Sequence, residues 1–275
     1  MTDTRTSAIE EIKAKLEQGI TDVMTSDNYK AWLDTISKFH NYSFNNQILI
    51  TMQKPEATRV AGFSTWKSME RHINKGEKAI KIIAPIPHKY TKLVKDVHGN
   101  ETEEELTWCS FKVVNVFDVS QTSGKELPSM MPKQVTEEVE NFADVVEALK
   151  KATSATIIFE SMDGETANGY YNNADHSIHI KDTMPEAMQI KTLAHEIAHS
   201  ILHSNDTETE YKIKEMQAES VAYIVSSYLG IDTSSYSFNY VAGWSGEKDT
   251  QTLKIEMSKI TDTARKIIDL LEKVA

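Results

Sequence analysis

Three polar side chains interrupt an apolar helical stretch, and this feature most constrains how the chain can fold. The segment Leu193–His203 reads LAHEIAHSILH, with His195, Glu196 and His199 set among apolar residues. The apolar positions recur every three or four residues and form one broad face: Ile190, Leu193, Ala194, Ile197, Ala198, Ile201 and Leu202. A helix with such a face is expected to be buried. Because buried polar groups cost free energy unless they are paired, the histidines and the glutamate need bonding partners.

A metal ion would be such a partner. His195 and His199 are four residues apart, so on a helix over roughly 186–203 both imidazoles reach one ion. Neutral imidazole suits Zn²⁺, and a catalytic zinc site has three protein ligands and an open position for water. Glu196 is predicted to be the catalytic base that acts on this water. Cys109 is the single cysteine, which excludes a cysteine-built zinc site. The alternative is an exposed helix edge with ordinary His and Glu residues.

A second helix, predicted at about 209–229, offers two carboxylates for the third ligand position. Its segment KEMQAESVAYIV contains Glu215 and Glu219, one helical turn apart. Glu219 has apolar and aromatic helical neighbours that place it toward the core, whereas Glu215 has more solvated neighbours. We therefore expect Glu219 to complete a His₂Glu zinc site with His195 and His199. Glu215 is the alternative ligand.

The spacing of these residues resembles that of a known enzyme class. The interval from His199 to Glu219 is similar to that of gluzincin metallopeptidases, and LAHEIAHSIL and QAESVAYIVSSYLG resemble the ImmA/IrrE-type metallopeptidase domain. The resemblance implies a zincin-like fold and a protein or peptide substrate. One position departs from the pattern: thermolysin-type sites have an Asp four residues after the ligand glutamate, where this chain has Tyr223. The partner that orients His195 is therefore unassigned.

The chain has 275 residues, which is long enough for two domains. The turn-rich segment Gln121–Lys133 contains one Gly and two Pro and is predicted as the boundary between domains at 1–128 and 134–275. Ser177–Lys181 alternates apolar and polar residues, as in a strand that lies either at a peptide-binding sheet edge or in the interior. Helices are predicted at 7–19, 27–39, 66–72, 135–151, 186–203, 209–229 and 248–273, and strands at 79–85, 111–119, 156–160, 169–171 and 177–181. The mixture predicts the α+β class.

Charge divides unevenly between the two halves. Residues 1–134 hold 18 Lys+Arg against 17 Asp+Glu, a net charge of +1, and residues 135–275 hold 12 against 24, a net charge of −12. Residues 54–95 hold 10 basic against 3 acidic residues, or +7, and contain Phe63 and Trp66. A basic segment with interleaved aromatics suits a groove for single-stranded nucleic acid. Aromatic residues of a small domain are also commonly core residues, and clustered charge also occurs on ordinary solvated surfaces.

The first half resembles the single-stranded-DNA-binding domain of ArdC-type proteins in four segments: Phe44-Asn45-Asn46-Gln47, Gly62-Phe63-x-x-Trp66, Lys75-Gly76-Glu77-Lys78 and Val116-Phe117-Asp118-x-x-Gln121-Thr122. In that family the domain precedes a zincin domain, and members occur on plasmids, conjugative elements and phages. The resemblance implies an antirestriction role and DNA contacts by Trp66, Arg71, Lys75, Lys78 and Lys81. The expected architecture is a small α+β nucleic-acid-binding domain followed by a zincin-like metallopeptidase domain.

Three functions agree with these features. The first is a mobile-element protein that binds single-stranded DNA, hydrolyses a protein substrate with zinc and counters restriction. The second is a regulatory protease resembling ImmA, which cleaves a repressor and does not bind DNA. The third is a DNA-binding protein with structural zinc, which is disfavoured because a structural site has no need of Glu196 as a base. No apolar run approaches the length of a bilayer span and no secretory signal is visible, so a cytoplasmic protein without a membrane partner is expected.

Overall fold

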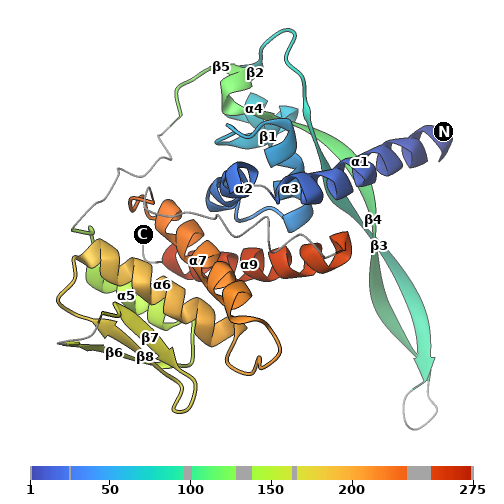
Figure 1. Ribbon diagram of the computed structural model, residues 1–275. Helices are drawn as coiled ribbons and strands as arrows, with labels where there is room; N and C mark the ends of the chain where they lie inside the picture. The colour runs from blue at the N-terminus through green and yellow to red at the C-terminus, as the bar shows by residue number, and fades with distance from the viewer. Residues whose placement is uncertain are drawn as a thin grey trace.

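The computed structural model describes residues 2–24, 26–95, 101–127, 138–162, 166–233 and 249–273. The fold is of the predicted α+β class, and strands of the described residues form three small sheets that lie beside a group of helices (Figure 1). None of the described helices is both long enough and apolar enough to cross a membrane.

The chain begins with three helices: α1 (Thr2–Asp22), α2 (Ser26–Lys38) and α3 (Phe44–Gln53). The first contains the helix predicted at 7–19, and the second matches the helix predicted at 27–39 but ends one residue earlier. No helix was predicted at α3, where the consecutive residues Ile48, Leu49 and Ile50 are all buried. Because α3 is covered on more than one side, it lacks the amphipathic period by which a surface helix is identified.

A long antiparallel hairpin follows, formed by β3 (Ile80–Lys95) and β4 (Glu101–Asp118). Its outer part projects away from the helices (Figure 1). Sequence patterns predicted only the inner ends of these strands, at 79–85 and 111–119. The inner ends pack against the core, whereas the outer ends carry charged and exposed residues and lack a buried face that would give a strand pattern.

Short elements flank this hairpin. β1 (Val60–Gly62) pairs with β4, and β2 (Arg71–Ile73) pairs with β5 (Thr122–Gly124). Helix α4 (Phe63–Ser68) connects β1 to β2. The helix predicted at 66–72 therefore begins earlier than expected, and its last residues were wrong because Arg71 and His72 pair as a strand.

The second half combines helices with a three-stranded sheet: α5 (Phe142–Lys150), β6 (Thr156–Glu160), β7 (Gly169–Asn172), β8 (Ser177–Lys181), α6 (Glu186–Leu202), α7 (Tyr211–Tyr228) and α9 (Thr250–Leu271). The strand order is β6-β8-β7, with β8 parallel to β6 and antiparallel to β7. β8 is therefore the interior strand, and the alternative that it lies at a sheet edge was wrong. The edge strand that packs against α6 is β7.

One hydrophobic core joins helices from both halves of the chain, including α1, α2, α3, α5, α6, α7 and α9. Helix α2 packs against α7, where the hydroxyls of Tyr29 and Ser220 are 2.9 Å apart and the Tyr223 hydroxyl donates to Asp34 at 2.5 Å. The predicted boundary at Gln121–Lys133 lies partly outside the described residues. The first helices thus share a core with α6 and α7, while the first half also has a smaller hydrophobic cluster of its own, around Ile50, Ile80 and Val116.

Candidate metal centre

The two histidines of the motif lie on α6, whose apolar face is buried as predicted. The Nε2 atoms of His195 and His199 are 3.1 Å apart. Their side chains are only 19% and 15% exposed, so both rings are largely withdrawn from solvent. The four-residue spacing has therefore brought two possible metal ligands to one place.

Glu215 on α7 supplies a carboxylate to this pair. Its Oε1 atom is 3.3 Å from His199 Nε2, and its Oε2 atom is 3.6 Å from His195 Nε2. Bonds of about 2.0–2.1 Å from a tetrahedral zinc ion place neighbouring ligand atoms about 3.3–3.4 Å apart. The three residues therefore form a group with the spacing that a single ion requires.

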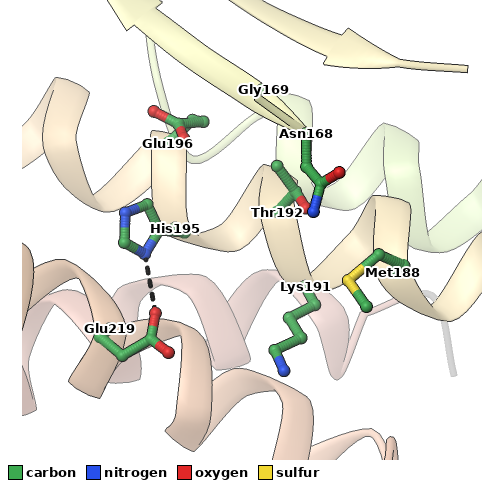
Figure 2. A pocket seen from close by; sticks show the side chains of 8 residues that line it. All are labelled: Asn168, Gly169, Met188, Lys191, Thr192, His195, Glu196 and Glu219. Atoms are coloured by element: carbon green, nitrogen blue, oxygen red, sulfur yellow. Dashed lines mark hydrogen bonds and ion pairs between the residues drawn. The ribbon is translucent and has the colours of Figure 1, made fainter. Parts of the chain in front are cut away.

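Glu219 lies on the other side of the His195 ring, which differs from the prediction that it is the third ligand. Its Oε2 atom is 3.1 Å from His195 Nδ1 (Figure 2). Because Nδ1 and Nε2 point in different directions, the carboxylate at Nδ1 is not directed to the position between the Nε2 atoms. It has instead the position of a carboxylate that orients a metal-binding histidine. The sequence contained a signal for this arrangement. Thermolysin-type sites have an acidic residue four positions after the ligand glutamate; Tyr223 stands at that position relative to Glu219, but Glu219 itself stands there relative to Glu215.

The two carboxylates also set the charge of the histidine pair. Burial lowers the pKa of His195, but hydrogen bonds to Glu215 and Glu219 outweigh burial and raise this pKa to about 9. Burial raises the pKa of Glu215, but its contacts with the rings of His195 and His199 hold it well below its usual range. At neutral pH and without metal, the raised pKa keeps His195 protonated, with one proton on Nε2. A bound cation has to displace this proton.

Glu196 is buried beside the sheet, with 7% of the residue exposed. Its carboxylate accepts a hydrogen bond from the backbone N–H of Tyr171 on β7. Burial raises the pKa of Glu196, and this effect exceeds the opposing influence of His195 and His199. A raised pKa favours general acid–base catalysis near neutral pH, because the group can then both take up and release a proton.

A pocket of about 330 Å³ opens beside His195 and Glu196 (Figure 2). Gly169 forms part of its wall where β7 meets α6. A Cβ atom at this glycine would lie 2.7 Å from the carbonyl oxygen of His179 and 2.7 Å from Cγ2 of Thr192. A larger residue would push β7 away from α6, so the glycine allows the edge strand to border the site.

Tyr211 is a further residue of the site that the sequence analysis did not select. It lies one turn before Glu215 on α7, is 74% exposed, and hydrogen-bonds to the Glu215 carboxylate. The charge of Glu215 raises the pKa of the phenol, so the hydroxyl remains a proton donor at neutral pH. The four-residue interval between the two was the signal for this contact.

Two of the predicted DNA contacts in the first half have structural roles instead. Trp66 is fully buried, and its Nε1–H donates to the carbonyl of Phe117 at 2.9 Å. A base cannot stack on a ring that the core covers. The Arg71 guanidinium donates to the hydroxyl of Thr122 at 2.8 Å and to carbonyl oxygens of β5 and the residue after it. These contacts tie β2 to β5 and occupy most of the N–H donors that a phosphate would need.

The three predicted lysine contacts lie on the surface. Lys75, Lys78 and Lys81 are all exposed in the turn between β2 and β3 and in the first residues of β3. Phe63 is an exposed aromatic residue of the same half, at 63% exposure, three residues before the buried Trp66. The motif Gly62-Phe63-x-x-Trp66 holds both rings, and nothing in it indicates which one faces solvent.

Comparisons with known proteins match the two halves separately. Residues 2–117 match the N-terminal domain of anti-restriction factor ArdC, and residues 151–237 match the IrrE N-terminal-like domain of the M78 peptidase family. An uncharacterized protein of Bacillus anthracis is 27% identical over an alignment 305 residues long. The alignment covers 96% of this chain and 52% of that protein. The chain thus spans about half the length of this curated relative.

Crystal structures of the antirestriction protein ArdC from plasmid R388 share the fold. The metal-free structure has a TM-score of 0.55 at 20% identity and covers 94% of this chain and 96% of that chain. The Mn(II)-bound structure has a TM-score of 0.54 at 19% identity, with 94% and 97% covered. The chain therefore combines a domain similar to the N-terminal domain of ArdC with a following IrrE-type domain, and it shares its fold with R388 ArdC.

Proposed function

We propose that this protein is a zinc-dependent peptidase whose metal ligands are His195, His199 and Glu215. The observation that carries the proposal is the approach of two imidazole nitrogens and a carboxylate to 3.1–3.6 Å of one another, next to the buried Glu196. Two neutral imidazoles and one carboxylate are a ligand set of catalytic zinc. Manganese is the competing ion, because R388 ArdC has a Mn(II)-bound structure.

Glu196 is the proposed catalytic base. A zinc ion bound here would lower the pKa of a water molecule and polarise the substrate carbonyl. Glu196 takes a proton from the attacking water and returns it to the leaving amine, a role that its raised pKa favours. The exposed phenol of Tyr211 is the proposed donor to the oxyanion that develops on the substrate.

The proposed substrate is a peptide in extended conformation, paired with the edge of β7 that no other described strand occupies. β7 is an edge strand, and the N–H of Tyr171 on its outer side already bonds a carboxylate, that of Glu196. An edge with such donors can bind peptide by strand addition. The pocket beside His195 would then accept a substrate side chain.

Glu196→Gln tests the peptidase proposal, because it removes the base and leaves the ligands. The zinc-loaded protein and the variant are incubated with a proteome-derived peptide library, and cleavage is read by mass spectrometry. We expect wild-type cleavage, none by the variant, and equal zinc content. Cleavage by Glu196→Gln at the wild-type rate would exclude Glu196 as the base, and no cleavage by zinc-loaded wild type would contradict the peptidase proposal. Glu186→Gln, at the start of α6, is the matched control.

We also propose that the first half binds single-stranded DNA and that the cellular role is antirestriction, on a mobile element. The support is the match to the ArdC N-terminal domain together with exposed basic residues and the exposed ring of Phe63. Lys75, Lys78 and Lys81 would contact phosphates, and Phe63 would stack on a base. The buried Trp66 is no longer included.

The DNA proposal is tested by titrating the full chain with single-stranded oligonucleotides at several salt concentrations. Binding should fall steeply with salt, because phosphate contacts release counterions. Replacing Lys75, Lys78 and Lys81 together with Glu should remove most of the binding. The matched control has the same changes at three exposed lysines of the acidic half: Lys151, Lys266 and Lys273. A wild-type chain without affinity at low salt would favour the repressor-cleaving protease instead.

A further inference from the structure

A chain of hydrogen bonds leads from the metal-site histidine His199 to the last helix. His199 Nδ1 is 3.0 Å from His203 Nδ1, and His203 Nε2 is 2.9 Å from the amide oxygen of Gln217. The Gln217 amide nitrogen donates to Glu256 on α9 at 2.5 Å. His203 and Gln217 are only 8% and 2% exposed, so water has little access to these bonds.

The direction of each bond follows from its far end. The carboxylate of Glu256 only accepts, so Gln217 turns its NH₂ group to it and its carbonyl oxygen to His203. His203 must then donate from Nε2, and in the neutral ring Nδ1 is left as an acceptor. His199 consequently donates from Nδ1, which leaves the lone pair of its Nε2 directed at His195 and Glu215.

We propose that His203, Gln217 and Glu256 are positioning residues that hold His199 as its Nδ1–H tautomer, ready to bind metal through Nε2. The inference rests on the proposed metal site and extends it by a set of supporting residues. His195 has a different arrangement, because its Nδ1 faces the carboxylate of Glu219 directly.

Glu256 lies outside the segment that matches the IrrE-type domain, which ends at residue 237. Its helix α9 packs against α7 on one side and also contacts α1 and α3 of the ArdC-type half. The last helix therefore has two roles. It contributes apolar residues to the shared core, and its Glu256 sets the donor–acceptor direction of the hydrogen bonds that lead to the metal site.

The tautomers can be measured directly in the metal-free full-length protein. Two-bond ¹H–¹⁵N correlation spectra distinguish a protonated Nδ1 from a protonated Nε2 in each histidine. We expect an Nδ1–H signal for His199 and an Nε2–H signal for His203. An Nδ1–H tautomer or an imidazolium at His203 would overturn the proposal. This measurement requires neither zinc binding nor hydrolysis, so its failure is distinct from failure of the peptidase proposal.

Variants then separate positioning from ordinary packing, with zinc affinity measured by chelator competition. His203→Leu removes the acceptor and should weaken zinc binding by about 10–100-fold, the usual effect of losing an outer partner of a ligand. His203→Gln keeps an acceptor and should recover most of this loss. If both variants bind zinc as tightly as wild type, His203 serves packing only and the proposal fails.

Glu256→Gln tests the far end of the chain. Its amide can donate as well as accept, so the orientation of Gln217 is no longer imposed. We expect a smaller loss of zinc affinity than for His203→Leu and a weaker Nδ1–H signal for His199. Asp262→Asn is the matched control, because it makes the same charge change on α9 at a side chain that is 72% exposed. Equal behaviour of the two α9 variants would remove Glu256 from the proposal.

Discussion

The metal centre and the basic surface of the first half differ in how many contacts hold each side chain in place. At the metal centre, His195 is held from two sides by Glu215 and Glu219 at 3.6 and 3.1 Å. On the basic surface, exposed lysines such as Lys75 and Lys78 extend into solvent. Metal ligands must converge within a few ångströms, whereas phosphate contacts need only positive charge near a surface. Spacing in the sequence is therefore informative for the first region and composition for the second.

The largest expected effect distinguishes the two glutamates of α7. Glu215→Ala should lose stoichiometric zinc, because a ligand is removed. Glu219→Ala should keep zinc with an affinity lower by about 10–100-fold, because it loses only the partner of His195 Nδ1. The measurement is elemental analysis after gel filtration, together with chelator competition. If Glu219→Ala loses the metal while Glu215→Ala retains it, Glu219 is the ligand after all.

The next effect concerns stability in the ArdC-type half. Trp66→Ala should lower the free energy of unfolding by about 3–5 kcal/mol, because it removes a fully buried indole and its hydrogen bond to Phe117. The measurement is equilibrium unfolding in urea. An unchanged free energy of unfolding together with weaker DNA binding would return Trp66 to the nucleic-acid surface.

Phe63→Ala should have the opposite signature. Its ring is 63% exposed, so unfolding should be nearly unaffected. Binding of single-stranded DNA should weaken by about 1–3 kcal/mol if the ring stacks on a base. Phe111→Ala, on β4, is the matched control, because that ring is 53% exposed but lies on the hairpin. Equal losses for both variants would mean that the aromatic contact is not specific to Phe63.

Counted per pH unit, the smallest expected effect is the pH dependence of zinc affinity. The pKa of His195 without metal is raised to about 9, above the ordinary 6.5. Zinc needs the neutral ring, so its apparent affinity should fall by about tenfold per pH unit below pH 9 and level off above it. The same raised pKa stabilises the metal-free fold below pH 6.5, and this stabilisation is lost as pH rises toward 9. Calorimetric titrations with zinc between pH 6 and 9 measure the affinity. An affinity that does not change with pH would contradict a protonated His195 in the metal-free site.

Several elements were predictable because their signals are local. The apolar period of α6 and the interval from His195 to His199 predicted a buried helix with two histidines on one face, and the structure has both the helix and the paired rings. The hairpin was predicted only at its inner ends, and α3 was not predicted, because a projecting ribbon and a fully covered helix lack a two-faced pattern. The sequence did not predict that Trp66 is buried while Phe63, three residues earlier, is exposed.

By itself, the sequence determined the chemistry of the site: which residue types are present, and that His195, Glu196 and His199 lie on one buried helix. This follows because the geometry of one helical turn is the same in every helix. Only the tertiary structure decided that Glu215 faces the Nε2 atoms while Glu219 faces Nδ1. The two glutamates are four residues, about 6 Å, apart along α7, so the packing of α7 against α6 selects between them. That packing depends on a core shared by both halves of the chain, which no local pattern records.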